Sequence, residues 1–325
     1  MTKFNVLIPA ISWPRIAPRF REFSDATPVL LDREGTLIDL HDNKWEGPLH
    51  GAWHNFEISR PALKPFLQSI KIAESLQFMQ TAASGLDAPF FADILRRGII
   101  LCNSDAQSLS IAEYVVASLL NVLHNFPARK SSQLAKTWQR HPFREVAGLN
   151  IVVVGYGNIG SRIVHRLRGF EADITVVRRE TEPLNDTVRM ATLAELPDLL
   201  PRTDVIILAC ALNDQTRHLL DATKLQSCKD ETIIINVARG ALIDESALLT
   251  ALDRNVGHAV LDVFETEPLP QEHPFWSHPN VSVTAHSSNA GSGRERRGDD
   301  LFLENLQAYL QNKPLRNLVD VQTLA

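Results

Sequence analysis

The chain has 325 residues, of which 44% are hydrophobic and 22% charged, and a formal net charge of -5. One hydrophobic core rarely serves so long a chain, so the length predicts two domains. The negative charge argues against a general nucleic-acid-binding or membrane-surface role, and small molecules are the expected partners.

The first residues and the cysteines predict a protein of the cytoplasm. Residues 1–12 carry a lysine but no sustained apolar run with a small-residue cleavage site, and no run of the chain is apolar over the length that spans a bilayer. Cys102, Cys210 and Cys228 lie far apart, without the spacing of a disulfide framework or of a C-x-x-C pair. We expect a reducing compartment, no membrane attachment and no bound metal.

Short apolar runs and one helical pattern fill the first hundred residues. Strands are expected at residues 5–10, 28–32 and 98–103, and a helix over 62–75. These elements predict a small α/β domain.

A long helix is expected over residues 108–126, where apolar side chains recur at helical spacing. Ser108 or Ser110 could cap its start, and Pro127 limits its end. We expect this helix to carry the chain from the first domain into the second.

From residue 148 onward, apolar runs alternate with helical patterns. Strands are expected at residues 150–155, 174–177, 204–211, 232–238, 258–264 and 281–286. Strands that are apolar on both faces and joined by crossovers predict a parallel sheet covered by helices on both sides. A last amphipathic helix, over 294–310, is expected to return to the first domain.

A glycine motif follows the strand at 150–155. Gly155, Gly157 and Gly160 form G-x-G-x-x-G directly before a helical pattern. The first glycine permits a tight turn, the second lets the backbone approach a pyrophosphate, and the third lets the helix pack on the strand. The start of the helix also favours negative charge. We therefore predict a dinucleotide site here, with Asn158 and Ile159 included.

The strand at 174–177 ends in two arginines, Arg178 and Arg179. At this point an NAD site usually has Asp or Glu for the ribose 2'-hydroxyl, whereas an arginine can accept the 2'-phosphate of NADP. Glu180 and Glu182 lie nearby and keep NAD(H) possible. We predict a preference for NADP(H); the alternative is that the two arginines are a solvated strand end.

Three further stretches carry a family resemblance: "INVARGALIDESAL" (235–248), "LDVFETEPLPQEHPFW" (261–276) and "NVSVTAH" (280–286). Together they resemble the D-isomer-specific 2-hydroxyacid dehydrogenases, and the glyoxylate/hydroxypyruvate reductase branch is the most similar. The resemblance extends from residues 81–87 through 306–320. It implies an enzyme that reduces a small 2-oxo acid to the D-2-hydroxy acid.

The resemblance also implies an architecture. A Rossmann-type doubly wound domain, residues 103–288, would be inserted into a smaller flavodoxin-like domain formed by 1–102 and 289–325. The substrate would bind in the cleft between the two domains. The resemblance and the apolar positions of the 108–126 helix predict a homodimer, in which this helix and the segment around Trp138 contribute to the interface. The alternative is that the helix is buried within one subunit.

Three residues match the family's catalytic positions. Arg239 matches the arginine that binds the substrate carboxylate, a task suited to the planar guanidinium. His286 matches the general acid, since imidazole donates and recovers a proton near neutrality. Glu267 matches the carboxylate that pairs with this histidine and favours its protonated form. Glu265 is the rival carboxylate, but the family register places the acid directly before the proline.

Other residues receive roles by the same resemblance. The backbone amides of Ser84 and Gly85 would hold the substrate carboxylate. Asp262 would contact the nicotinamide carboxamide, and Ala238 would lie along the cofactor. Trp138 falls where an aromatic of the partner subunit can approach the substrate, although a plain interface or core tryptophan fits the sequence equally well.

A different class of function shares this fold. The alternative is a dinucleotide-sensing binding protein that resembles the C-terminal-binding-protein co-repressors. The arginine, glutamate and histidine are all present at the catalytic positions, so we favour an enzyme.

Overall fold

The computed structural model describes residues 3–179 and 188–320. The chain divides into two compact units, one made of Met1–Gln107 with Ser292–Ala325 and the other of Ser108–Gly291. It leaves the first unit once, completes the second, and returns to the first for its last helix.

The chain passes from one unit to the other at positions later in the sequence than predicted. Residues 103–107 stay with the first unit, five residues beyond the predicted end of its first part. The Asn103 amide donates to the Asn317 carbonyl at 3.0 Å and so ties this segment to the first unit. The return falls three residues later than predicted, because the Ser110 hydroxyl donates to the Asn289 carbonyl at 3.2 Å within the second unit.

One sheet forms the centre of the first unit. Its strands are β1 (Phe4–Pro9), β2 (Ala26–Leu31), β3 (Leu37–Ile38), β4 (Gly51–His54), β5 (Phe78–Thr81) and β6 (Ile100–Cys102). They lie in the order β3-β2-β1-β4-β5-β6, parallel except for the antiparallel pair β2 and β3. Without β3 this is the flavodoxin-like order, which confirms the predicted fold class. β4 and β5 were not predicted.

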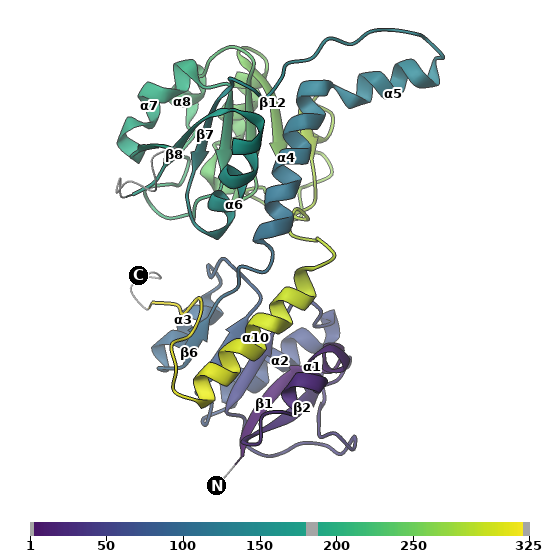
Figure 1. Ribbon diagram of the computed structural model, residues 1–325, viewed down its shortest axis with the longest axis vertical. Helices are drawn as coiled ribbons and strands as arrows, with labels where there is room; N and C mark the ends of the chain where they lie inside the picture. The colour runs from purple at the N-terminus through teal and green to yellow at the C-terminus, as the bar shows by residue number, and fades with distance from the viewer. Residues whose placement is uncertain (1–2, 180–187, 321–325) are drawn as a thin grey trace. The chain divides into compact units, whose positions relative to one another are not determined.

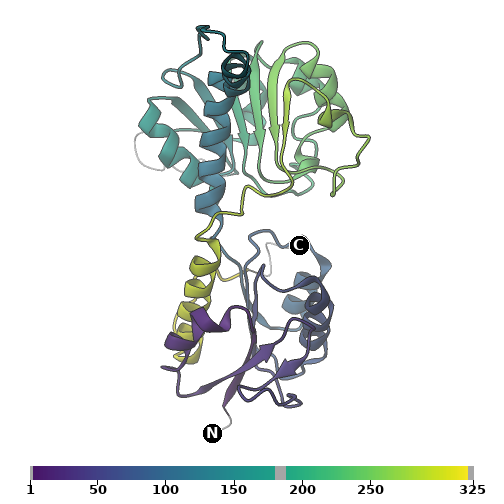
Figure 2. The same cartoon turned by 90° about the vertical axis from the view of Figure 1, so that its right-hand side faces the viewer.

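Helices cover both faces of this sheet (Figures 1 and 2). α1 (Trp13–Phe20) and α10 (Arg294–Leu310) lie on one face, and α2 (Arg60–Ile72) and α3 (Pro89–Arg96) lie on the other. Each pair buries its apolar side chains against the strands, so the sheet is shielded from water on both sides.

The carboxyl-terminal helix α10 completes the core of the first unit. It spans the residues predicted for it, and its Phe302, Leu303 and Leu306 are buried. The Phe302 ring stacks on Trp53 of β4 with centroids 5.3 Å apart. The last helix therefore packs on strands that come from the first part of the chain.

The second unit contains a larger parallel sheet. Its strands are β7 (Asn150–Val154), β8 (Asp173–Val177), β9 (Arg189–Ala191), β10 (Val205–Leu208), β11 (Thr232–Asn236), β12 (Val256–Leu261) and β13 (Val281–Val283). They lie in the order β13-β12-β11-β10-β7-β8-β9. The order from β9 to β12 is that of the doubly wound Rossmann sheet, which confirms the predicted fold class, and β13 adds one further strand. β9 was not predicted.

Helices also cover both faces of the second sheet. α4 (Ser108–His124) and α6 (Asn158–Leu167) pack on one face, and α7 (Leu196–Leu199), α8 (Ala222–Gln226) and α9 (Glu245–Leu252) pack on the other (Figure 2). The short 3-10 helices of this unit are η1 (Arg168–Phe170), η2 (Leu193–Glu195), η3 (Leu200–Arg202), η4 (Gly240–Leu242) and η5 (Pro274–Trp276). Buried aliphatic strands between two helical layers explain the near-continuous apolar runs of the sequence.

An arm follows α4. The helix ends at His124 because Asn125 adopts a left-handed conformation, φ 47°, and its side chain caps α5 (Phe126–Leu134). None of the residues of α5 is buried, and Figure 1 shows this helix running away from the rest of its unit. Within the described ranges, no single helix has the length and apolar character to cross a membrane; α4 and α5, bent by 57°, meet those criteria only as a pair.

Candidate functional site

An open cavity of about 530 Å³ lies beside the glycine motif of the second unit. It borders the ends of β7 and β10, which are neighbours in the sheet although β8 and β9 follow β7 in the chain. Ligands of open parallel sheets bind at such a reversal of strand order. The lining residues are Val154, Gly155, Tyr156, Gly157, Val177, Arg178, Arg179, Leu193, Ala209, Cys210, Ala211, Asn213, Gln215 and Thr216.

The turn after β7 requires its first glycine. Gly155 has φ +96°, and a Cβ at this position would lie 2.6 Å from the Ala209 carbonyl oxygen. Both the backbone conformation and the lack of space therefore exclude a side chain. Gly157 precedes α6, whose first residue, Asn158, is exposed, while Ile159 is half-buried. The start of a helix at this point offers backbone amides to an anionic group.

Arg178 and Arg179 follow the last residue of β8, and both line the cavity. Arg178 is half-buried, and its amide donates to the Ala191 carbonyl at 3.0 Å, which fixes the strand end beside β9. Arg179 is exposed. Glu180 and Glu182, the acids that kept NAD possible, lie outside the described residues.

Part of the cavity wall is the loop of residues 211–216 after β10, which was not predicted to border the cofactor site. In this loop the Thr216 hydroxyl donates to the Ala211 carbonyl at 2.8 Å and accepts from the Asn213 amide at 2.8 Å. Asn and Thr commonly form such local turns, so an Asn followed by Thr after a strand was the signal available in the sequence.

The two residues predicted as an acid pair are in contact. His286 Nδ1 lies 2.8 Å from Glu267 Oε2, and Glu267 Oε1 accepts the Phe264 amide at 3.0 Å. With Nδ1 bonded to the carboxylate, Nε2 is the ring nitrogen that can pass a proton to a substrate. The rival carboxylate, Glu265, lies instead 3.1 Å from His218 Nε2.

Asp262 is completely buried and holds the loop that carries His286. Asp262 Oδ1 accepts hydrogen bonds from Thr284 Oγ1 at 2.6 Å and Ser287 N at 2.8 Å, and Oδ2 accepts from Ser288 N at 3.0 Å. The His286 amide donates to the Asp262 carbonyl at 2.8 Å, and His286 has φ 48°. These bonds stabilise a left-handed turn at the histidine. The predicted contact of Asp262 with the nicotinamide carboxamide stays a prediction.

Arg239 and Ala238 follow β11. Arg239 is half-buried, its Nη1 donates to the Ala238 carbonyl at 2.7 Å, and its own carbonyl accepts from Asn236 Nδ2 at 2.9 Å. The next residue, Gly240, packs directly against the backbone of Phe264. The turn that carries the paired carboxylate thus lies beside the segment that carries the predicted substrate-binding arginine.

Ser84 and Gly85 belong to the first unit, in the loop after β5. With its side-chain oxygen facing this loop, Gln107 accepts hydrogen bonds from Ser84 N at 3.0 Å and from Ser84 Oγ at 2.9 Å. Asn103 Nδ2 donates to the Ser84 carbonyl at 3.1 Å. The loop is therefore held by side chains of its own unit, and its role in binding a carboxylate stays a prediction.

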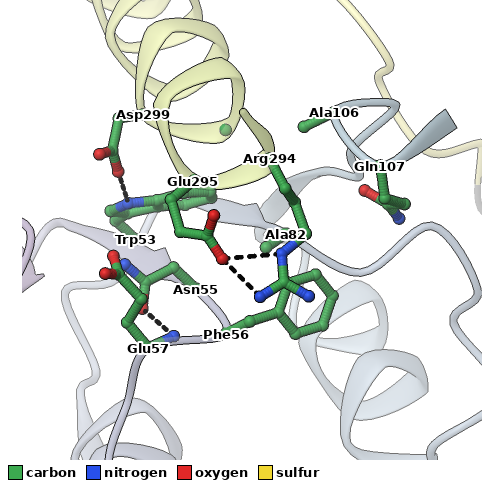
Figure 3. A pocket seen from close by; sticks show the side chains of 11 residues that line it. Trp53, Asn55, Phe56, Glu57, Ala82, Ala106, Gln107, Arg294, Glu295 and Asp299 are labelled. Atoms are coloured by element: carbon green, nitrogen blue, oxygen red, sulfur yellow. Dashed lines mark hydrogen bonds and ion pairs between the residues drawn. The ribbon is translucent and has the colours of Figure 1, made fainter. Parts of the chain in front are cut away.

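A much smaller hollow lies at the start of α10 in the first unit (Figure 3). Its volume of about 10 Å³ is that of a single water-sized space. Arg294 Cζ lies 4.7 Å from the centre of the Phe56 ring, and Trp53 Nε1 donates to Asp299 Oδ1 at 3.0 Å. With Arg294 packed on the Phe56 ring and Asp299 bound to Trp53, the space that is left is too small for a substrate.

Trp138 lies in the loop after α5 and is fully exposed. The interpretation as a core tryptophan is therefore wrong, because α5 and this loop extend beyond the core of their own unit. Phe126, Leu134 and Phe143 of the same arm are also exposed. In the part of the chain that the structure describes, no group of three or more His, Cys, Asp or Glu residues is arranged to hold a metal ion.

Comparisons with known proteins agree with this arrangement. Residues 116–288 match the family model described as D-isomer specific 2-hydroxyacid dehydrogenase, NAD binding domain. A solved structure of a D-isomer specific 2-hydroxyacid dehydrogenase family protein from Aeromonas salmonicida subsp. salmonicida A449 has a TM-score of 0.78 and 25% identity, and the match covers 99% of this chain and 100% of that one. This likeness confirms the predicted fold.

Relatives with named activities include a plant reductase and an archaeal dehydrogenase. The chain is 33% identical over 257 residues to the glyoxylate/hydroxypyruvate reductase HPR3 of Arabidopsis thaliana, which covers 76% of this chain and 77% of that protein. It is 29% identical over 275 residues to the D-3-phosphoglycerate dehydrogenase of Methanocaldococcus jannaschii, which covers 82% of this chain and 52% of that enzyme. The chain thus spans about half the length of the archaeal relative.

Proposed function

Because the chain belongs to the D-isomer specific 2-hydroxyacid dehydrogenase family, we propose that it reduces a small 2-oxo acid, such as glyoxylate or hydroxypyruvate, to the D-2-hydroxy acid with NADPH. The observation that carries this proposal is the 2.8 Å contact between His286 Nδ1 and Glu267 Oε2. Similarity to the Arabidopsis reductase supports the choice of substrate class.

The reaction needs a hydride for the keto carbon and a proton for the keto oxygen, and the reduced dinucleotide, when bound, supplies the hydride. His286 donates the proton from Nε2, while Glu267 at Nδ1 stabilises the protonated ring and fixes its orientation. Arg239 binds the substrate carboxylate through two parallel hydrogen bonds and thereby orients the carbonyl. The Ser84 and Gly85 loop contributes further contacts to the carboxylate.

The cofactor preference rests on the end of β8. Arg178 and Arg179 border the same cavity as Gly155 and Gly157. Guanidinium groups at this strand end would bind a 2'-phosphate, whereas an NAD site would have an acid there. We therefore propose NADP(H) as the preferred cofactor.

The exposed arm supports a homodimer. Leu134 is 72% exposed, and Trp138 is as exposed as an isolated side chain. Apolar groups of this size are rarely left in water together, and a second copy of the chain would cover them. Ile111, Val115 and Leu119 of α4 are buried within the unit, so these three side chains would not lie at the interface; the contribution of the rest of α4 stays a prediction.

A panel of 2-oxo acids tests the proposal. Oxidation of NADPH and of NADH would be followed with glyoxylate, hydroxypyruvate and larger 2-oxo acids. We expect steady turnover with glyoxylate or hydroxypyruvate and a higher kcat/KM with NADPH. Dinucleotide binding without turnover on any 2-oxo acid would instead favour a co-repressor-like sensing protein.

A further inference from the structure

Glu245 is a partly buried acid that the proposed mechanism does not use. It is the first residue of α9, whose start is capped by Asp244 through the Ala247 amide at 3.0 Å. The side chain of Glu245 is 18% exposed, and burial, together with the charge of Glu265, raises its pKa. A glutamate that only stabilised the helix dipole would not need to leave water. Its burial therefore points to the group that it contacts.

That group is the turn that carries Glu267. Glu245 Oε1 accepts the Glu265 amide at 2.9 Å. The preceding residue, Phe264, donates its amide to Glu267 Oε1 at 3.0 Å. Two consecutive amides of one turn are thus bound by two carboxylates, one from α9 and one from the turn itself. The direction of Glu267 toward His286 depends on how this turn is held.

Close packing limits the turn further. A Cβ on Gly240 would overlap the backbone of Phe264, and the Phe264 side chain is 7% exposed. Around the acid itself, His273 Nε2 lies 3.5 Å from Glu245 Oε2. Packing sets the position of the turn, and the hydrogen bond that the Glu265 amide donates to Glu245 fixes the plane of that peptide.

We propose that Glu245 is a positioning residue: its carboxylate holds the Glu265 amide and thereby aims Glu267 at His286. This inference rests on the proposed reduction of a 2-oxo acid. Glu245 itself would touch neither substrate nor cofactor. Since a displacement of about 1 Å can cost up to about a hundredfold in rate, releasing the turn should slow the reaction and leave binding intact.

Two substitutions of Glu245 separate positioning from a merely structural role. Glu245→Ala removes the acceptor, and we expect kcat with glyoxylate and NADPH to fall by about tenfold to a hundredfold, with KM changed by less than about twofold. The alkaline limb of the pH–rate profile should also move to lower pH, because a misdirected Glu267 no longer favours the protonated imidazole. Glu245→Gln keeps an oxygen that can accept the Glu265 amide, and should restore most of the turnover.

Asp253→Ala serves as the matched control. Asp253 is the carboxylate at the opposite end of α9, 78% exposed and 3.5 Å from His278. Its substitution should leave both kcat and the pH–rate profile as in the wild type. Unchanged kcat in Glu245→Ala, or an equal loss in Glu245→Ala and Glu245→Gln, would overturn the proposal.

A second readout does not depend on turnover. If the wild type reduces no 2-oxo acid, the proposed function fails, and an NMR titration of the His286 ring in the same variants still tests the positioning. The midpoint should move to lower pH in Glu245→Ala and remain near the wild-type value in Glu245→Gln. An unmoved midpoint in Glu245→Ala would show that the turn does not need this acid.

Discussion

At the scale of single residues, we propose that Arg178 sets the preference for NADP(H), because it borders the cavity beside the glycine motif. A charge-assisted hydrogen bond contributes about 1.5–3 kcal/mol, which corresponds to roughly a tenfold to a hundredfold preference for the phosphorylated dinucleotide. We expect Arg178→Asp to weaken NADPH by at least this factor and to leave NADH similar or better, as measured by kcat/KM for both cofactors. Arg202→Asp, an exposed arginine in η3 outside the cavity lining, is the control. If the ratio of kcat/KM with NADPH to kcat/KM with NADH is unchanged in Arg178→Asp, the two arginines are only a solvated strand end.

The site residues differ in how far the sequence could predict them. The register of the ETEP motif was enough to select Glu267 over Glu265, and their different histidine partners agree with that choice. Two contacts could not be predicted: the buried Asp262 carboxylate accepts from Thr284, and Glu245 accepts the Glu265 amide. Each contact joins residues about twenty positions apart, which only the fold brings together. Motif spacing predicts which residues react, but not which residues hold them in place.

At the scale of elements, strand composition decided what could be predicted. The aliphatic strands of the second sheet stand out because both faces are buried. β4 is short and begins with Gly51, and β5 contains Gln80, so neither forms a continuous apolar run. Gln80 is nevertheless buried, since its Nε2 donates to the Cys102 and Asn103 carbonyls at 3.2 and 2.8 Å. A buried polar residue of this kind interrupts the apolar run, so a search for apolar runs does not detect the strand.

The attachment of α10 to its unit should depend on pH. Burial raises the pKa of Asp299 from 3.8 to about 6, against the opposing effect of Arg15, whose Nε lies 2.7 Å from Asp299 Oδ2. The folded protein therefore holds this proton more tightly than the unfolded chain does. The resulting stabilisation is present below pH 3.8 and is lost as the pH rises through about 6.

Asp299→Asn removes this titration. Across that pH window we expect the wild type to lose on the order of 3 kcal/mol of unfolding free energy through Asp299. The unfolding free energy of the variant should not fall by this amount over the same pH range. Urea denaturation at a series of pH values would measure it. Asp300→Asn is the control, since it removes an exposed carboxylate of α10 that lies 2.7 Å from Arg19 of α1. Equal slopes in wild type and Asp299→Asn would show that Asp299 does not couple folding to pH.

At the scale of the whole molecule, the arm predicts a dimer. Sedimentation at micromolar concentration should give twice the chain mass of 36.3 kDa. Leu134→Asp places a charge on the exposed apolar surface of the arm and should shift the protein toward the monomer. Ile72→Asp, at a similarly exposed apolar side chain of the first unit, should leave the dimer intact. A wild-type monomer under these conditions would contradict the prediction.

We propose that His286, held by Glu267, supplies the proton when a 2-oxo acid is reduced. The most direct measurement is kcat for glyoxylate reduction by His286→Ala, with NADPH affinity determined in parallel and His165→Ala, an exposed histidine of α6, as the control. Loss of a general acid should lower kcat by about 10²–10⁴-fold while NADPH still binds within about twofold of wild type. A kcat within about twofold of the wild-type value would show that His286 is not the general acid.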